Sequence, residues 1–293
     1  MTEKGIDMKL FRKIGCIIAA IGVTVGLTGC SGTSLPGNIS EQLTFQDGDL
    51  IAEISIENYG TMKAKLFPDI APNGVKNFTE LAKQGYYDGL KIHRVAADMC
   101  IQGGSLNGDG TGGTAVINKD GEDFDIEISE NARNFYGALG YANTNGKNNT
   151  QFYIVNCKKQ KDITTYDSSA IKALAEECTS KAAELPENDT DRDVLTAQAT
   201  YYTNLADLTG KASEGVINRY KTTGGYPAWD GGYTVFGQVY EGLDVLDKIS
   251  AAEVTVSASG ELSKPVEDIV ISSIKIIEYV TPEPAPEEST SSK

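Results

Sequence analysis

The stretch IHRVAADMCIQGG, residues 92–104, carries the strongest structural signal in this 293-residue chain. Two apolar runs, at 91–95 and 99–102, flank a turn, which predicts two neighbouring extended segments. Arg94 precedes Gln102 by eight residues. The frame therefore places an arginine and a glutamine on two extended segments that are joined by a turn.

On both sides of this stretch, short runs alternate between apolar and polar residues, as strands of a half-buried sheet do. Residues 51–57 and 61–67 alternate around a turn at 58–60, which predicts a β-hairpin. Pro72 begins a helix that ends near Gly85. Further apolar runs, separated by turns rich in Gly and Asn, lie at 135–142, 151–156, 233–239 and 269–280. Many short strands with few helices predict a mainly β fold, either an antiparallel barrel or a sandwich.

Between Lys158 and Gly225 the pattern becomes helical. Two stripes at helical spacing consist of Ile171, Leu174, Cys178, Ala182 and Leu185, and of Val194, Ala197, Tyr201, Leu205 and Leu208. We interpret 158–225 as a helical insertion that packs through these stripes against the β domain. The alternative is a lid or substrate-holding arm in which Tyr201 and Tyr202 face a ligand.

The N-terminal residues predict an export signal. Basic residues precede an uncharged run at 14–27 that is too short to span a bilayer. The run ends in LTGC (27–30), which resembles a bacterial lipoprotein signal in which Cys30 is lipidated; an ordinary secretory signal is the alternative. We therefore expect an extracytoplasmic protein that is held at the bacterial cell membrane only by a lipid anchor.

Composition sets the remaining boundaries along the chain. Residues 1–29 form the predicted signal peptide, 30–47 a flexible tether, 48–280 the folded domain, and the Pro- and Glu-rich 281–293 a disordered tail. The 26 basic and 41 acidic residues give a net charge of −15, which disfavours nucleic acid as a partner.

No metal or cofactor is expected. Cys100, Cys157 and Cys178 have no metal-ligand spacing and are interpreted as small apolar residues. A loop at 105–116 has some features of a calcium site, but Ser105 and Val116 replace two of the required carboxylates.

Five motifs in a fixed order resemble those of the cyclophilin family of peptidyl-prolyl cis-trans isomerases. They are IHR with MCIQGG (92–94, 99–104), GTGG (110–113), GALGYAN (137–143), TQFYI (150–154), and DG with VFG (230–231, 235–237). The resemblance covers about 50–157 and 226–280. It implies a closed eight-stranded antiparallel barrel, capped by two helices and carrying the helical insertion.

The resemblance also implies an activity: rotation of X-Pro bonds in secreted or envelope proteins by a monomeric enzyme, with proline-containing polypeptides as partners. Arg94 would stabilise the pyramidal nitrogen of the twisted imide, and Gln102 would orient Arg94 and the substrate. His93 is interpreted as structural, because this reaction transfers no proton. The substrate-binding positions implied by the family are Met99, Cys100, Ala142, Asn143, Gln151, Tyr153, Trp229 and Tyr233.

Departures from the family pattern leave alternatives open. Met99, Cys100 and Tyr153 replace a phenylalanine, a methionine and a second phenylalanine of the family, so the implied pocket is less aromatic. Trp229 lies one position from its family place, and Tyr233 stands where many members have histidine. A non-catalytic module that binds or chaperones proline-containing segments is the main alternative, followed by a purely structural lipoprotein.

Either of two arrangements would exclude the proposed chemistry. Arg94 buried in an ion pair, or turned away from Gln102 and Tyr153, would leave the imide nitrogen without a donor.

Overall fold

A computed structural model of the chain describes residues 42, 44–144 and 146–282. The predicted signal peptide, Cys30, most of the predicted tether and residues 283–293 lie outside this range. No helix in the described part of the chain combines the length and the apolar character needed to cross a bilayer.

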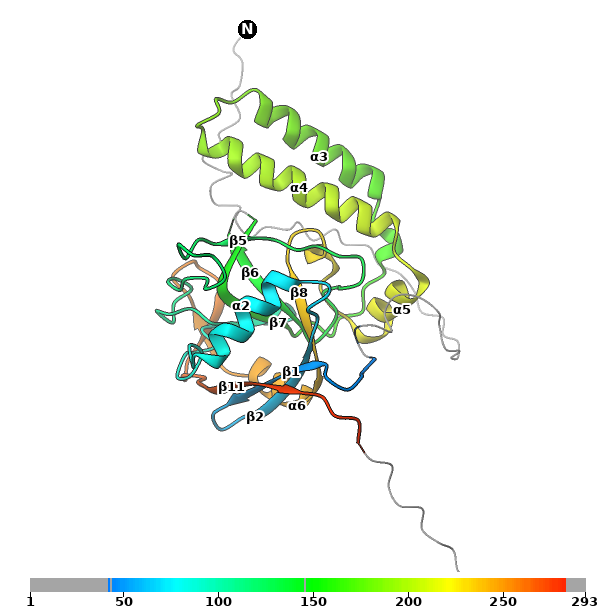
Figure 1. The fold of residues 1–293 in the computed structure, drawn as a ribbon. Helices are drawn as coiled ribbons and strands as arrows, with labels where there is room; N and C mark the ends of the chain where they lie inside the picture. The colour runs from blue at the N-terminus through cyan, green and yellow to red at the C-terminus, as the bar shows by residue number, and fades with distance from the viewer. Residues whose placement is uncertain (1–41, 43, 145, 283–293) are drawn as a thin grey trace, which may run out of the picture. The chain divides into compact units, whose positions relative to one another are not determined.

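A nine-stranded antiparallel sheet forms the body of the fold (Figure 1). The strand order is β11-β1-β2-β8-β6-β7-β4-β3, and β5 pairs with β7. The bounds of these strands are Leu50–Ile56 (β1), Gly60–Leu66 (β2), Arg94–Ala96 (β3), Cys100–Gly103 (β4), Phe124–Asp125 (β5), Ala138–Thr144 (β6), Lys147–Val155 (β7), Val235–Glu241 (β8) and Ile271–Glu278 (β11). A separate hairpin pairs β9 (Val254–Val256) with β10 (Leu262–Pro265). The predicted mainly β fold, including the hairpin of β1 and β2, is confirmed.

The sheet is curled, but the expected closed barrel is not confirmed. The strand path ends at β3 and β11. Between these edges there is one isolated bridge, Lys91 to Val270, flanked by backbone hydrogen bonds of 2.8 Å from Gly89 to Ile271 and from Ile92 to Ile269. Gly89 has a φ of 80°, which a regular strand does not contain. The segment before β3 therefore meets β11 in a few bonds and does not form a continuous ladder with it.

Two helices outside the insertion pack on the sheet. The predicted helix at Pro72 is α2 (Pro72–Lys83), which contacts β7 and β11, and α6 (Leu243–Ser250) contacts β2, β3 and β4. The buried ring of Phe78 on α2 lies 5.7 Å from that of Phe152 and 5.0 Å from that of Phe236, centroid to centroid. This aromatic packing fixes the helix over strands that also carry the candidate site.

Residues 158–225 contain three α-helices, of which α3 and α4 lie side by side (Figure 1). Their bounds are Ser168–Ala183 (α3), Thr190–Gly210 (α4) and Glu214–Thr223 (α5). The predicted stripes are partly wrong, because Leu174 is 44% and Val194 39% exposed. Buried alanines replace them, including Ala175 on α3 and Ala199 on α4. Small residues let the two helices approach closely, so these larger side chains are left at the surface.

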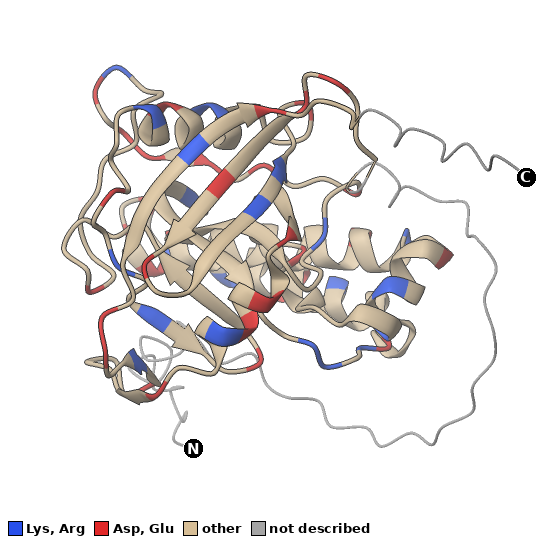
Figure 2. Cartoon of the chain, turned by 90° about the horizontal axis from the view of Figure 1, so that it is seen from below, with Lys and Arg blue, Asp and Glu red and all other residues tan. Residues whose placement is uncertain are grey.

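Charged residues of both signs are interspersed across the strands (Figure 2). Lys63 of β2 lies 3.2 Å from Glu241 of β8 and 4.0 Å from Glu53 of β1. Such exposed pairs add little stability.

Candidate active site

Arg94 and Gln102 face each other across neighbouring strands. The antiparallel register of β3 and β4 pairs them directly, and Arg94 Nη1 donates to Gln102 Oε1 at 3.2 Å. The connecting turn contains Asp98 with a φ of 54°, a left-handed conformation that aspartate tolerates better than most residues. A three-residue strand and a tight turn thus suffice to bring the predicted pair together.

A chain of amide hydrogen bonds fixes the orientation of Gln102. Its Nε2 donates to Gln151 Oε1 at 3.1 Å, and Gln151 Nε2 donates to the carbonyl oxygen of Gly110 at 3.0 Å. Because the nitrogen of the Gln102 amide is used towards Gln151, its oxygen is directed to Arg94. The GTGG loop at 110–113 therefore supports the Arg94–Gln102 pair through Gln151.

The predicted apolar positions belong to one cluster beside this pair. Cys100, Tyr153 and Trp229 are buried in it, whereas Met99, Ala142 and Tyr233 are partly exposed. The rings of Tyr153 and Trp229 lie 4.9 Å apart, and those of Trp229 and Tyr233 lie 5.1 Å apart, between centroids. We call the three buried side chains the floor of the site; the other three are partly exposed.

Asn143 ties two segments of the site together. Its Nδ2 donates to the carbonyl oxygen of Gly232 at 2.7 Å, and its Oδ1 accepts from the Gly146 N–H at 3.3 Å. The register of β6 and β7 shifts between Tyr141 and Asn143, so that Ala142 lies opposite the extra residues 149–151 of β7. This irregularity takes Ala142 and Gln151 out of the regular ladder at the edge of the apolar cluster.

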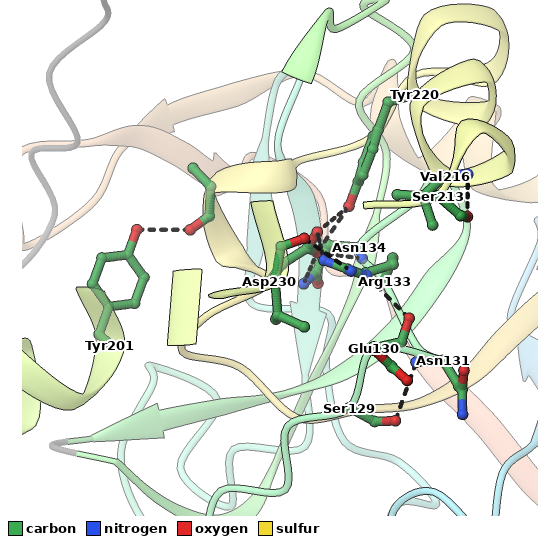
Figure 3. A network of polar contacts seen from close by, with 12 residues as sticks. Ser129, Glu130, Asn131, Arg133, Asn134, Tyr201, Ser213, Val216, Tyr220 and Asp230 are labelled. Carbon is green, nitrogen blue, oxygen red and sulfur yellow. Dashed lines mark hydrogen bonds and ion pairs between the residues drawn. The ribbon is translucent and has the colours of Figure 1, made fainter. Parts of the chain in front are cut away.

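A buried polar network around Asp230 reaches into the insertion (Figure 3). The Asp230 carboxylate accepts from Arg133 Nη1 at 3.3 Å and from the backbone N–H of Asn134 at 2.9 Å. The hydroxyl of Tyr153 donates to Asn134 Oδ1 at 2.6 Å, and that of Tyr220, from α5, donates to Asp230. Burial raises the pKa of Asp230, opposed by Arg133 and by these hydrogen bonds. The network links the floor residue Tyr153 to the helical insertion.

Glu261, the residue directly before β10, is a site residue that the sequence does not reveal. Its carboxylate binds Arg94 in a bidentate ion pair, with Oε2 2.7 Å from Nε and Oε1 2.8 Å from Nη2. Hydrogen bonding to Arg94 lowers the pKa of Glu261, with burial opposing. It lies 167 residues after Arg94 in a polar SASGE segment, so no local pattern marks it.

This ion pair is a contact of Arg94 that the family resemblance does not imply. The pair is not enclosed, because the side chains of Arg94 and Glu261 are 20% and 34% exposed. Arg94 also donates from Nη1 to Cys100 Sγ and from Nη2 to Met99 Sδ, both at 3.1 Å. It therefore stays beside Gln102 and the apolar cluster, and because the ion pair is only partly buried, neither of the excluding arrangements is realised.

The His93 side chain is neutral at pH 7. Burial, and secondarily the charge of Arg94, lowers its pKa to about 4. Its backbone N–H donates to the Gln102 carbonyl at 3.0 Å, which is part of the pairing around the site.

Within the described residues, no three His, Cys, Asp or Glu side chains are grouped so that they could hold a metal ion. In the loop considered for calcium, Asp109 Oδ1 instead accepts from the Thr111 N–H at 2.9 Å and from its hydroxyl at 2.6 Å. The carboxylate thus serves to close the turn.

Comparison with known proteins identifies related chains. A family model described as cyclophilin type peptidyl-prolyl cis-trans isomerase/CLD matches residues 51–171 and 193–276. A Staphylococcus saprophyticus protein named "Putative peptidyl-prolyl cis-trans isomerase" is 36% identical over 233 residues, covering 79% of this chain and 94% of its own length. A Staphylococcus aureus (strain USA300) protein of the same name is 36% identical over 222 residues, covering 75% of this chain and 89% of its own length.

Solved structures with a detectable likeness include a cyclophilin type peptidyl-prolyl cis-trans isomerase from Cryptosporidium parvum. The two chains are 20% identical, with a TM-score of 0.49 and coverage of 80% of this chain and 99% of the other.

Proposed function

This chain belongs to the family of cyclophilin-type peptidyl-prolyl cis-trans isomerases, and from that premise we propose that it accelerates X-Pro rotation by an arginine-assisted mechanism. The observation that supports this most directly is the placement of Arg94 against Gln102 at the edge of the apolar cluster that contains Met99 and Tyr153. A charged donor and an apolar surface are thus adjacent.

The chemistry follows from the electronic structure of the imide. Rotation is opposed by a barrier of ~18–20 kcal/mol because the nitrogen lone pair is delocalised into the carbonyl. A guanidinium that hydrogen-bonds the prolyl residue in its twisted state stabilises the localised lone pair, and donors that are already oriented need no reorganisation during the reaction. Gln102, held by Gln151, keeps Arg94 in place.

The apolar cluster supplies the second requirement, a hold on the ring. Met99, Ala142 and Tyr233 are its partly exposed members, over the buried Cys100, Tyr153 and Trp229. With the pyrrolidine ring held there, the carbonyl side of the bond is free to turn. Backbone groups of Asn143 would bind the residue before proline.

We further propose that the enzyme acts as a lipid-anchored monomer outside the cytoplasm on proline-containing secreted or envelope proteins. The support is the LTGC sequence at 27–30 after an uncharged run. Uncatalysed isomerisation takes tens to hundreds of seconds, so clients that fold outside the cytoplasm benefit from a catalyst.

The test is an isomerisation assay on a short Ala-Pro peptide. We expect the purified chain to accelerate isomerisation, and Arg94→Ala to lose on the order of 10²-fold or more of kcat/KM while keeping its circular dichroism spectrum. An Arg94→Ala variant with full activity would refute the arginine mechanism.

A second candidate function is a non-catalytic module that binds or chaperones proline-containing segments. The observation that favours it is the ion pair to Glu261, which engages the guanidinium. Peptide binding without any rate enhancement in the unmodified chain would establish this alternative.

A further inference from the structure

The guanidinium of Arg94 is fully engaged within the chain, and its partners differ in strength. A guanidinium has five N–H donors. Five hydrogen bonds leave Arg94: two to Glu261, one to Gln102, and one each to the sulfur atoms of Met99 and Cys100. An incoming substrate must therefore take the place of an existing acceptor.

Which acceptor is replaced follows from the chemistry of the partners. The bonds to Glu261 are short, at 2.7 and 2.8 Å, and join opposite charges, which makes them the strongest of the five. The thioether of Met99 and the thiol of Cys100, both at 3.1 Å, are weak acceptors. A substrate therefore displaces sulfur and leaves Glu261 bound.

The bidentate pair also determines which edge of the guanidinium faces the substrate. Two parallel bonds from Nε and Nη2 to one carboxylate fix both the direction and the rotation of the planar group. The opposite edge, formed by Nη1 and Nη2, is then directed at Met99, Cys100 and Gln102. That edge borders the apolar cluster.

Glu261 is itself well placed for this task. The Ser257 N–H donates to the Glu261 carbonyl at 2.8 Å, which closes the turn between β9 and β10, and β10 packs against β3, the strand of Arg94. The carboxylate thus approaches Arg94 from a turn that has its own backbone support and leads into a strand packed against β3.

We propose that Glu261 is a positioning residue for the isomerase reaction: by holding the Nε edge of Arg94, it presents the other edge of the guanidinium to the prolyl bond. This role rests on the proposed function. In the opposite interpretation, Glu261 blocks Arg94 and must leave before catalysis. Removing the Glu261 carboxylate would then raise kcat, whereas the positioning role predicts that it lowers kcat.

The experiment compares full-length wild type, Glu261→Gln and Glu261→Asp, with Glu267→Gln as a matched control that removes one exposed carboxylate from the segment after the same hairpin. We expect Glu261→Gln to lower kcat about 10-fold, since small misplacements of a catalytic group cost up to ~10²-fold. The dissociation constant of an Ala-Pro peptide should change less than about two-fold, since the residues of the apolar cluster are unaltered. Glu261→Asp, which keeps the charge, should recover part of kcat, and Glu267→Gln should match wild type.

Equal or higher kcat in Glu261→Gln, with wild type active, would overturn the positioning role alone. A thermal unfolding curve for each variant separates misplacement of Arg94 from loss of the fold. Wild type without any rate enhancement would overturn the proposed function, and this role with it.

Discussion

The hydroxyl of Tyr220 lies 2.8 Å from each carboxylate oxygen of Asp230 (Figure 3). Tyr220 belongs to α5 of the insertion, and Asp230 directly follows Trp229 of the apolar cluster. Arg133 adds a contact to α4, since its Nη2 donates to the Leu208 carbonyl at 3.2 Å. The insertion is thus joined to the floor of the candidate site by buried polar bonds.

Asp230→Asn should destabilise the protein strongly. Arg133 and Asp230 are both only 3% exposed, so removing the negative charge leaves a buried, uncompensated guanidinium. Breaking such a pair costs about 3–5 kcal/mol in the free energy of unfolding. Urea denaturation followed by circular dichroism measures the loss.

The matched control for this prediction is Asp244→Asn, which breaks the exposed pair of Asp244 with Lys248 on α6. Its unfolding midpoint should coincide with that of wild type, because exposed pairs contribute little. If Asp230→Asn also left the midpoint unchanged, the network would be unimportant for stability.

Arg94→Lys should be nearly as inactive as Arg94→Ala. Lysine keeps the positive charge but has one nitrogen, which cannot form the paired bonds to Glu261 and reach Gln102 as well. Loss of an oriented donor costs on the order of 10²–10³-fold in kcat. Measured kcat and KM for the peptide decide the point: a lysine variant within a few-fold of wild type would mean that charge alone suffices.

The pairing of Arg94 with Gln102 could be predicted because the two residues are close in sequence. Arg94 and Gln102 are separated by one turn, and the short strands around them pair in the expected antiparallel way. Glu261 could not be predicted in the same way. Its ion pair depends on how the hairpin of β9 and β10 packs on β3, a tertiary contact to which no periodicity in the sequence corresponds.

The helical insertion shows the same limit at the level of packing. Its helical character follows from local spacing, and the structure adds a cap at Asp189, whose side chain accepts from the Asp191 N–H at 2.8 Å. The identity of the buried face does not follow from that spacing, because the close approach of α3 and α4 favours alanines such as Ala175 over the larger Leu174. Local sequence therefore predicts that a helix forms, whereas the helix against which it packs determines which of its faces is buried.

Stability should fall in mild acid because of His93. Burial, and then the charge of Arg94, lowers its pKa from 6.5 to about 4. Between these two values the unfolded chain binds a proton that the folded chain does not, so stability is complete above about 6.5 and is lost as the pH falls towards about 4. The loss is about 1.4 kcal/mol per pH unit and roughly 3 kcal/mol in total.

Urea denaturation at a series of pH values checks this, with His93→Gln as the comparison. As the pH falls through this interval, the unfolding free energy of wild type should decrease relative to that of His93→Gln, because only wild type carries the titrating imidazole. A difference that stays constant with pH would show that His93 titrates normally in the folded protein.

Gly231→Ala should displace α4 of the insertion relative to the loop that carries Trp229. A Cβ at Gly231 would lie 2.6 Å from the Tyr201 carbonyl oxygen and from the Leu205 nitrogen, both in the backbone of α4. Such contacts force the helix or the loop to move, at a cost of about 1–3 kcal/mol. The Tyr201 hydroxyl donates to the Ala228 carbonyl at 2.7 Å, so the shift is transmitted to the neighbouring Trp229.

The fluorescence of Trp229, the only tryptophan in the chain, reports this shift directly. Its side chain is buried, so displacement of the loop should move its emission to longer wavelength in Gly231→Ala before unfolding begins. The control is Gly210→Ala at the end of α4, where a Cβ would have no neighbour nearer than 3.7 Å. That variant should keep the wild-type emission and be equally or more stable, because alanine favours helix over glycine. Identical emission from wild type and Gly231→Ala would mean that α4 does not constrain the floor of the site.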